Sequence, residues 1–282
     1  MLDCVISRLF IFCLKGSKCI YLKHCALMRV YLHEMVSVPL SVKHNFPLQK
    51  YVLWIGVFPA LIIPCIGALF YFVWFAESNW VQPVYASIKL FTLVWPVFGA
   101  FFLLKEGLGK LGAMFKFQWN IVMEGVGCGI LMSLCVLFVL FSPFGNAVFE
   151  HAAVVREKAE QMGVISHFVI FGLFLSFLHS LLEEYYWRWF VFGNLHRFLN
   201  SKSLAYGVGA LGFASHHIVV TTQFFHGPIG WIYGLTVGVA GAIWSWLMVR
   251  HQSLIGAWVS HIIVDITLMS VGYHLIFHVS SK

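Results

Sequence analysis

The stretch His179-Ser-Leu-Leu-Glu183-Glu184-Tyr-Tyr-Trp-Arg188 lies inside an otherwise apolar run that begins near residue 164. It places two adjacent carboxylates and an arginine where the surrounding residues predict a helix in lipid. A charged side chain at the centre of a membrane costs about 3 kcal/mol or more, so such residues are rare there and mark structural or chemical sites. This stretch therefore predicts a membrane helix and indicates where function is to be sought.

The composition of the whole chain agrees with a membrane location. Its 282 residues are 60% hydrophobic and only 10% charged, whereas soluble domains carry about 25% charged residues. The apolar runs are long and continuous rather than alternating, which favours spanning helices over a β-barrel. We therefore predict an all-α, polytopic transmembrane helix bundle in a lipid bilayer.

The basic residues and the cysteines argue against two other classes of protein. The net charge is +7, but lysine and arginine are scattered through short loops and form no basic stripe, so we expect no nucleic-acid partner. The seven cysteines include no Cys-x-x-Cys pair, which gives no indication of a disulfide framework or of a cysteine metal site.

About seven apolar segments are long enough to cross a membrane. Their approximate ranges are 51–76, 84–104, 119–141, 164–198, 203–222, 228–249 and 253–277. The connection 142–163 is polar, and it predicts a short helix at the membrane surface.

The chain divides into three parts by composition. We expect residues 1–47 to form a cytoplasmic N-terminal segment, to which no function is assigned, and residues 48–118 to supply the first two spans. Residues 119–282 are expected to form the functional membrane core. Because Met28 and Met35 lie shortly before the first span, we expect translation to start later than the first residue.

Loop charges predict the orientation in the membrane, because lysine and arginine accumulate in cytoplasmic loops. Basic residues lie before the first span and in every second connection, at Lys43, Lys50, Lys105, Lys110, Lys116, Arg197, Lys202 and Arg250. The alternate loops hold only Arg156 and Lys158. The predicted topology therefore has a cytoplasmic N-terminus and an external C-terminus.

A Gly-x-Gly-x-Gly run occupies the third span at Gly125, Gly127 and Gly129. It resembles a dinucleotide-binding fingerprint only in its letters, because no strand precedes it. Close packing of this helix against another helix is the better interpretation.

The two carboxylates of the opening stretch differ in their neighbours. Glu184 and Arg188 are four residues apart with the acid first, the favourable order for an ion pair within a helix. Glu183 points about 100° away around the helix, with His179 one turn before it on the same side. A carboxylate without its own cation in an apolar setting suits a general base. The alternative is that all three charged groups only hold helices together.

Two further spans carry polar groups. The fifth contains His216 and His217, and because neighbouring residues point to different faces, we expect at most one of them to meet Glu183. The last contains His261 and Asp265, four residues apart on one face. Each group alone could serve helix packing. Three helices bring acids and histidines into hydrocarbon. These polar groups would most simply find partners in one shared polar cavity.

Three short motifs, each on its own apolar segment, resemble the signature of the CAAX protease and bacteriocin-processing (CPBP) family of intramembrane endopeptidases, which includes the type II CAAX prenyl proteases. Their residues here are Glu183-Glu184-x-x-x-Arg188, Phe213-x-x-x-His217 and His261-x-x-x-Asp265. The resemblance covers about residues 120–277. It implies an integral, multi-pass protein of the bacterial inner (plasma) membrane.

The resemblance also implies roles for individual residues. Glu183 and His217 would activate the attacking water, while His261 and Asp265 would face the developing oxyanion. Peptide hydrolysis needs a base for water and donors for the tetrahedral oxygen, so these roles agree with the chemistry of the residue types.

In the same resemblance, Glu184 and Arg188 would orient the site. Two positions depart from the family pattern: Trp189 stands where glycine is common, and Asp265 where asparagine is usual. An ionised carboxylate cannot donate a hydrogen bond as an amide does. Asp265 must therefore be protonated, orient His261 or bind a positive group.

A metal site is the open alternative. Glu183, His217 and His261 would make an acceptable three-ligand zinc site with a fourth position for water. However, the sequence contains no His-Glu-x-x-His motif, and a Glu and His pair can activate water without metal. The residues thus demand no cofactor and leave zinc as an alternative.

We expect an intramembrane endopeptidase whose peptide or protein substrate, prenylated or not, enters the bundle from the membrane. A different class is a non-catalytic protein on the same fold, for bacteriocin immunity or scaffolding of a membrane partner. A proton-coupled transporter would also explain acids and histidines in the membrane, but the sequence shows no internal repeat of the kind such transporters carry.

Overall fold

The structure is a computed structural model that describes residues 51–106 and 109–279. All elements in these ranges are helical. Seven helical runs are long and apolar enough to cross a membrane: Val52–Trp74, Val81–Leu103, Trp119–Leu140, Ile165–Phe198, Lys202–Phe224, Pro228–His251 and Ile255–Phe277. The prediction of an all-α bundle with seven spans is confirmed, and the protein is an integral, multi-pass membrane protein.

Several spans change helical pitch along their length. The first joins η1 (Val52–Val57), α4 (Phe58–Leu69) and η2 (Phe70–Trp74), and the second joins α5 (Val81–Phe98) and η3 (Gly99–Leu103). The fourth consists of η5 (Ile165–His167), α10 (Phe168–Phe174), η6 (Leu175–His179), α11 (Ser180–Glu183), η7 (Glu184–Phe192) and α12 (Gly193–Phe198). Of these, η1, η2, η3, η6 and η7 are π-helical. Such wide turns are frequent at functional sites.

The other spans are uninterrupted α-helices: α7 (Trp119–Leu140), α13 (Lys202–Phe224), α14 (Pro228–His251) and α15 (Ile255–Phe277). Short helices occupy the connections: α6 (Gly109–Ala113), η4 (Pro143–Gly145), α8 (Asn146–Glu150) and α9 (Ala152–Gln161). The helix expected within 142–163 is thus confirmed as α9, and its position at the membrane surface stays a prediction. Residues 1–47 lie outside the described residues, and the division at residue 118 and the orientation in the membrane stay predictions.

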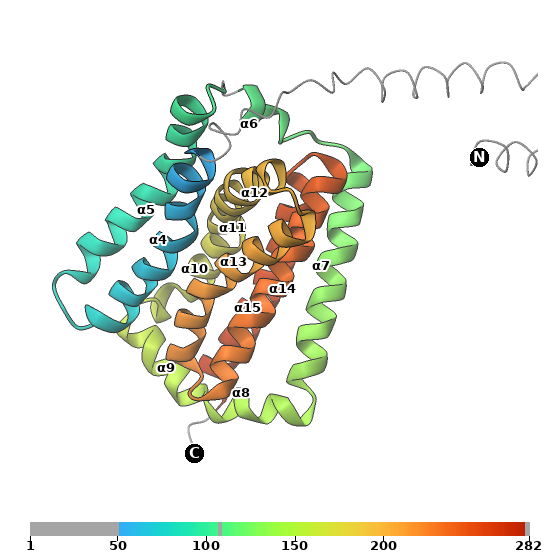
Figure 1. The fold of residues 1–282 in the computed structure, drawn as a ribbon. Coiled ribbons are helices and arrows are strands. Elements are labelled where there is room, and N and C mark those ends of the chain that lie inside the picture. The colour runs from blue at the N-terminus through green and yellow to red at the C-terminus, as the bar shows by residue number, and fades with distance from the viewer. Residues whose placement is uncertain (1–50, 107–108, 280–282) are drawn as a thin grey trace, which may run out of the picture. The chain divides into compact units, whose positions relative to one another are not determined.

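The glycine run of α7 packs this helix against α15. Helices α4 and α5 lie at one side of α13 to α15, and α7 lies at the other (Figure 1). A Cβ atom on Gly129 would lie 3.0 Å from the side chain of Ile263, and one on Gly125 would collide with the backbone of Gly256, whereas Gly127 faces open space. The interpretation as a helix-packing surface is confirmed for Gly125 and Gly129, and Gly127 takes no part in it.

The π-helical segment η7 lies in the core of the bundle. Eight of its residues are buried: Glu184, Tyr185, Tyr186, Trp187, Arg188, Phe190, Val191 and Phe192. The Tyr185 hydroxyl donates to the carbonyl of Leu93 at 2.9 Å, and the Tyr186 hydroxyl donates to that of Ala60 at 2.8 Å. These bonds tie η7 to α5 and α4 and fix the height of the charged residues within the bundle.

Candidate active site

Glu184, Arg188 and His261 form the innermost polar group. Glu184 and Arg188 are only 0% and 1% exposed. Arg188 Nε lies 3.3 Å from Glu184 Oε2, which is ion-pair distance, although the two atoms do not meet hydrogen-bond geometry. The other oxygen, Glu184 Oε1, accepts a hydrogen bond from His261 Nδ1 at 2.8 Å. The predicted ion pair is therefore present, and it also holds the histidine of the last span.

The guanidinium of Arg188 is enclosed by aromatic rings. Its Cζ atom lies 4.1 Å from the ring centroid of Phe213 and 5.0 Å from that of Trp244. Cation–π attraction of this kind is strongest where water is absent. A Cβ atom on Gly241 would lie 3.0 Å from Arg188 Nη2, so a small residue in α14 leaves the space that the guanidinium fills.

Glu183 faces several imidazoles, and His261 is one of them. Its Oε1 lies 3.5 Å from His179 Nε2 and 3.7 Å from His216 Nε2, and its Oε2 lies 3.7 Å from His261 Nε2. His217 belongs to the same cluster, because ligand atoms of Glu183, His216 and His217 all lie within 4.8 Å of one another. The expectation that at most one of the adjacent histidines would meet Glu183 is wrong.

His216 was not predicted as a site residue. Its ring lies parallel to that of Trp187, with centroids 5.3 Å apart and planes inclined by 1°. This stack holds the His216 imidazole on one side of α13, and His217 lies on the neighbouring side. The Glu183 carboxylate lies close to both rings. The adjacent pair of histidines was the signal in the sequence, but the stacking partner comes from another helix.

His217 is held by the backbone of its own helix. His217 Nδ1 lies 2.9 Å from the Phe213 carbonyl oxygen. A carbonyl can only accept, so Nδ1 carries the hydrogen and Nε2 is left as an acceptor. The backbone of α13 thereby fixes the ring so that its free nitrogen can bind water or a metal ion.

His261 and Asp265 lie one turn apart in α15. The ring of His261 stacks on Trp244, with centroids 3.8 Å apart and planes inclined by 17°. Trp244 is itself held by a hydrogen bond from Nε1 to Ser260 Oγ at 3.1 Å. Asp265 Oδ1 lies 3.6 Å from His261 Nε2, so its carboxylate approaches the imidazole. The catalytic roles of these residues stay predictions.

The residues present fit a metal ion, in a different combination from the predicted one. Among the described residues, one group of three possible ligands is close enough, and it contains Glu183, His216 and His217. Two imidazoles and a carboxylate are a common donor set for catalytic zinc. His261 of the predicted ligand set is not in this group, although its Nδ1 binds Glu184 and leaves its Nε2 3.7 Å from Glu183 Oε2.

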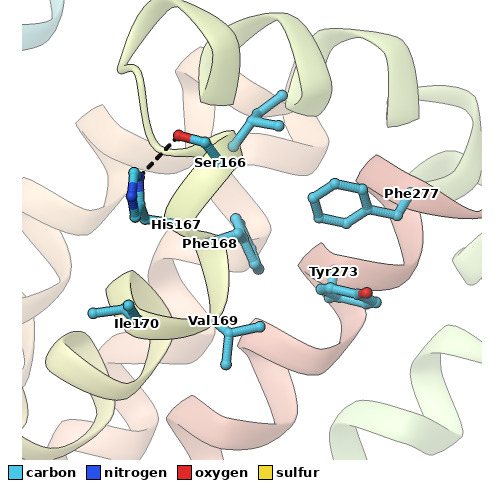
Figure 2. Close-up of a pocket in the computed structure, with 8 residues that line it drawn as sticks. Ser166, His167, Phe168, Val169, Ile170, Tyr273 and Phe277 are labelled. Atoms are coloured by element: carbon cyan, nitrogen blue, oxygen red, sulfur yellow. Dashed lines mark hydrogen bonds between the residues drawn. The ribbon is translucent and has the colours of Figure 1, made fainter.

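A hollow of about 510 Å³ lies elsewhere, between the start of the fourth span and the end of α15 (Figure 2). Its lining is mostly apolar and includes Phe168, Tyr273 and Phe277, with one hydrogen-bonded pair in which Ser166 Oγ lies 2.9 Å from His167 Nδ1. None of the predicted site residues lines it. It is distinct from the candidate active site.

The fold and the site together define a multi-pass membrane protein with a buried acid, histidine and arginine centre built from three spans. Residues 165–267 match the family model described as type II CAAX prenyl endopeptidase Rce1-like. No curated protein and no solved structure matches the chain significantly. The matched segment contains all three motifs, so the resemblance is confirmed: the chain is similar to the type II CAAX prenyl endopeptidases.

Proposed function

We propose that this protein is an intramembrane endopeptidase that hydrolyses a peptide bond with water activated by Glu183. The observation that carries this proposal is the surroundings of the Glu183 carboxylate, because three imidazole nitrogens lie 3.5–3.7 Å from its oxygens within an apolar bundle. A carboxylate placed among imidazoles is a good acceptor for the proton of an attacking water.

The chemistry follows from the hydrogen-bond directions in the site. Glu183 takes a proton from the water as its oxygen bonds to the peptide carbon, and His217 Nε2, the free nitrogen, accepts the second hydrogen of that water. The electron pair of the carbonyl moves to its oxygen, which receives a hydrogen bond from protonated His261 Nε2. When the carbon–nitrogen bond breaks, the proton on Glu183 passes to the leaving amine.

Glu184 supports this cycle through His261. Because Glu184 accepts from Nδ1, it favours a proton on the imidazole and turns Nε2 toward Glu183. Arg188 balances the charge of Glu184 from the other side. This arrangement supports the orienting role that we propose for the pair.

Zinc is the alternative source of an activated water. If Glu183, His216 and His217 hold it, the ion supplies a water of lowered pKa and a Lewis acid for the carbonyl. In that case His216 becomes essential, whereas direct activation by Glu183 and His217 requires it less.

The substrate to test first follows from the matched family. We propose a peptide with a prenylated cysteine near its C-terminus, which reaches the bundle from the lipid because its isoprenoid chain prefers hydrocarbon. We also propose a cytoplasmic N-terminus and the bacterial inner membrane as the location, on the basis of the loop charges and the resemblance.

The test uses the purified full chain in lipid nanodiscs with farnesylated and unmodified peptides. Glu183→Gln keeps the shape and removes the base, so cleavage should fall by about 10²- to 10⁴-fold, while the surface variant Glu160→Gln cleaves normally. Full cleavage by Glu183→Gln would rule out the proposal. If no peptide is cleaved and the Glu183→Gln variant still protects cells against a bacteriocin, the non-catalytic immunity function is favoured.

A chelator arm addresses the metal. Loss of cleavage with phenanthroline, its return with added zinc and a matching loss in His216→Phe would support the zinc site. Unchanged cleavage with chelator supports direct activation by Glu183.

A further inference from the structure

Lys89 is a cation inside the second span, in α5. It is partly buried, and its ammonium lies 5.4 Å from the ring centroid of Tyr85. Among the described residues, no aspartate or glutamate lies within the 4.0 Å of an ion pair to Lys89. Cations within membrane spans normally face a polar interior and pair with an acid, so an unpaired one indicates a functional role.

The packing places Lys89 at the height of the candidate active site. The hydrogen bond from Tyr185 to the Leu93 carbonyl joins α5 to η7 one turn beyond Lys89. The second and fourth spans run in the same direction, because the chain crosses the membrane twice between the start of one and the start of the other. One turn back from this contact, Lys89 is level with the turn that carries Glu183.

The charge of Lys89 also influences the candidate active site. Lys89 interacts electrostatically with Glu183, and His179 in turn feels the charge of Lys89. A lysine can also extend its stem so that the ammonium reaches the membrane surface. Leu93, one turn further along the same face of α5, contacts Tyr185 of η7, so Lys89 lies on the face of α5 that packs beside the site.

The missing partner of Lys89 is an anion, and the substrate can supply it. We infer that Lys89 binds a carboxylate of the substrate peptide, two or three residues from the bond that is cut, and thereby determines specificity. The ammonium of Lys89 lies beyond the 4.0 Å of an ion pair from Glu183, so we place the bound carboxylate more than one extended residue, about 3.5 Å, from the reacting bond. This inference rests on the proposed function.

Two kinds of carboxylate have this chemistry, namely the C-terminus of the chain and an acidic side chain. The test therefore uses matched peptides: one with a free C-terminus, one amidated, and amidated versions with aspartate or asparagine at the second or third residue after the scissile bond. For wild type we expect kcat/KM for the better acid to exceed that of its neutral match by about 10- to 100-fold, as for a hydrogen bond to a charged group.

The variants assign this preference to one side chain. Lys89→Met should bring the ratio of acid to neutral peptide close to one, and Lys89→Arg should retain most of it. Binding of the same peptides to Glu183→Gln, measured by fluorescence anisotropy, should show the same preference without cleavage. The acid that is preferred identifies the source of the carboxylate.

The outcomes separate this inference from the proposed function. If wild type cleaves acid and neutral peptides equally, or if Lys89→Met keeps the preference, the role of Lys89 is overturned while the protease stands. If Lys89→Met does not fold, the ratio of acid to neutral peptide is compared between wild type and Lys89→Arg. A ratio near one in wild type would overturn the role of Lys89. If no peptide is cleaved and none binds Glu183→Gln, both proposals fail together.

Discussion

Replacing Glu184 with alanine should unfold much of the protein, and the structure allows the loss to be worked out. The change leaves Arg188, which is 1% exposed, without its counter-charge. Removing one partner of a buried pair costs about 3–5 kcal/mol. It also removes the acceptor of His261 Nδ1, and an orphaned buried donor costs about 1–3 kcal/mol more. The sum of these two costs is comparable with the whole free energy of unfolding of a typical protein, about 5–15 kcal/mol.

The chain contains a matched control for this experiment. Arg156 and Glu160 form a pair of the same residue types and the same spacing, 3.1 Å apart, but their side chains are 57% and 56% exposed. Such a surface pair contributes about 0–1 kcal/mol, so Glu160→Ala should unfold at nearly the wild-type temperature.

The assay is the monodisperse fraction on size exclusion after heating in mild detergent, with the midpoint temperature as readout. Glu184→Ala should give little folded protein, or a midpoint many degrees below that of Glu160→Ala. The double variant Glu184→Leu with Arg188→Met removes both charges and should recover part of the yield. Equal midpoints for Glu184→Ala and Glu160→Ala would show that the buried pair does not stabilise the bundle, and the reasoning from its burial would be refuted.

Three further changes test the packing, the site and the topology. Gly129→Leu should destabilise the bundle by about 1–3 kcal/mol or more, because α15 leaves no room, whereas Gly127→Leu faces open space and should unfold like wild type in the same thermal assay. Trp244→Leu should lower cleavage more than it lowers yield, because it releases the ring of His261, and equal losses would indicate a packing role alone. A cysteine at Ser201 should react with an impermeant maleimide in inverted vesicles and not in intact cells, and the opposite pattern would reverse the predicted topology.

Much of the fold could be predicted because a membrane helix can be recognised from its own local sequence. The end of each of the seven runs lies within about three residues of its expected position, since a span is fixed by its own apolar length. The pairing of Glu184 with Arg188 was equally local, as the two residues share one helix. Both results needed no knowledge of the neighbouring helices.

The rest of the site depends on how the helices are rotated relative to one another. The spacing of residues along one helix carries no information about that rotation. The contact of His261 with Glu184 joins residues 77 positions apart. His216 reaches Glu183 while its ring stacks on Trp187 of another span. The π-helical pitch of η7 also changes the direction of each side chain, and no residue pattern in this segment predicts it.

The stack of His261 on Trp244 restricts how protons can move through the site. An imidazole that carries a proton between two partners often does so by turning its ring over, which exchanges the two nitrogens. Here the indole lies against one face, and Nδ1 is held by Glu184. A turn of the ring would have to break that bond and push the indole aside. Without a turn of the ring, a proton taken up at Nε2 can leave again from Nε2, or His261 can pass its Nδ1 hydrogen to Glu184, whose other neighbour, Arg188, cannot accept one. His261 can therefore lend a proton to the reacting oxygen and take it back, while the route onward through Glu184 ends at Arg188.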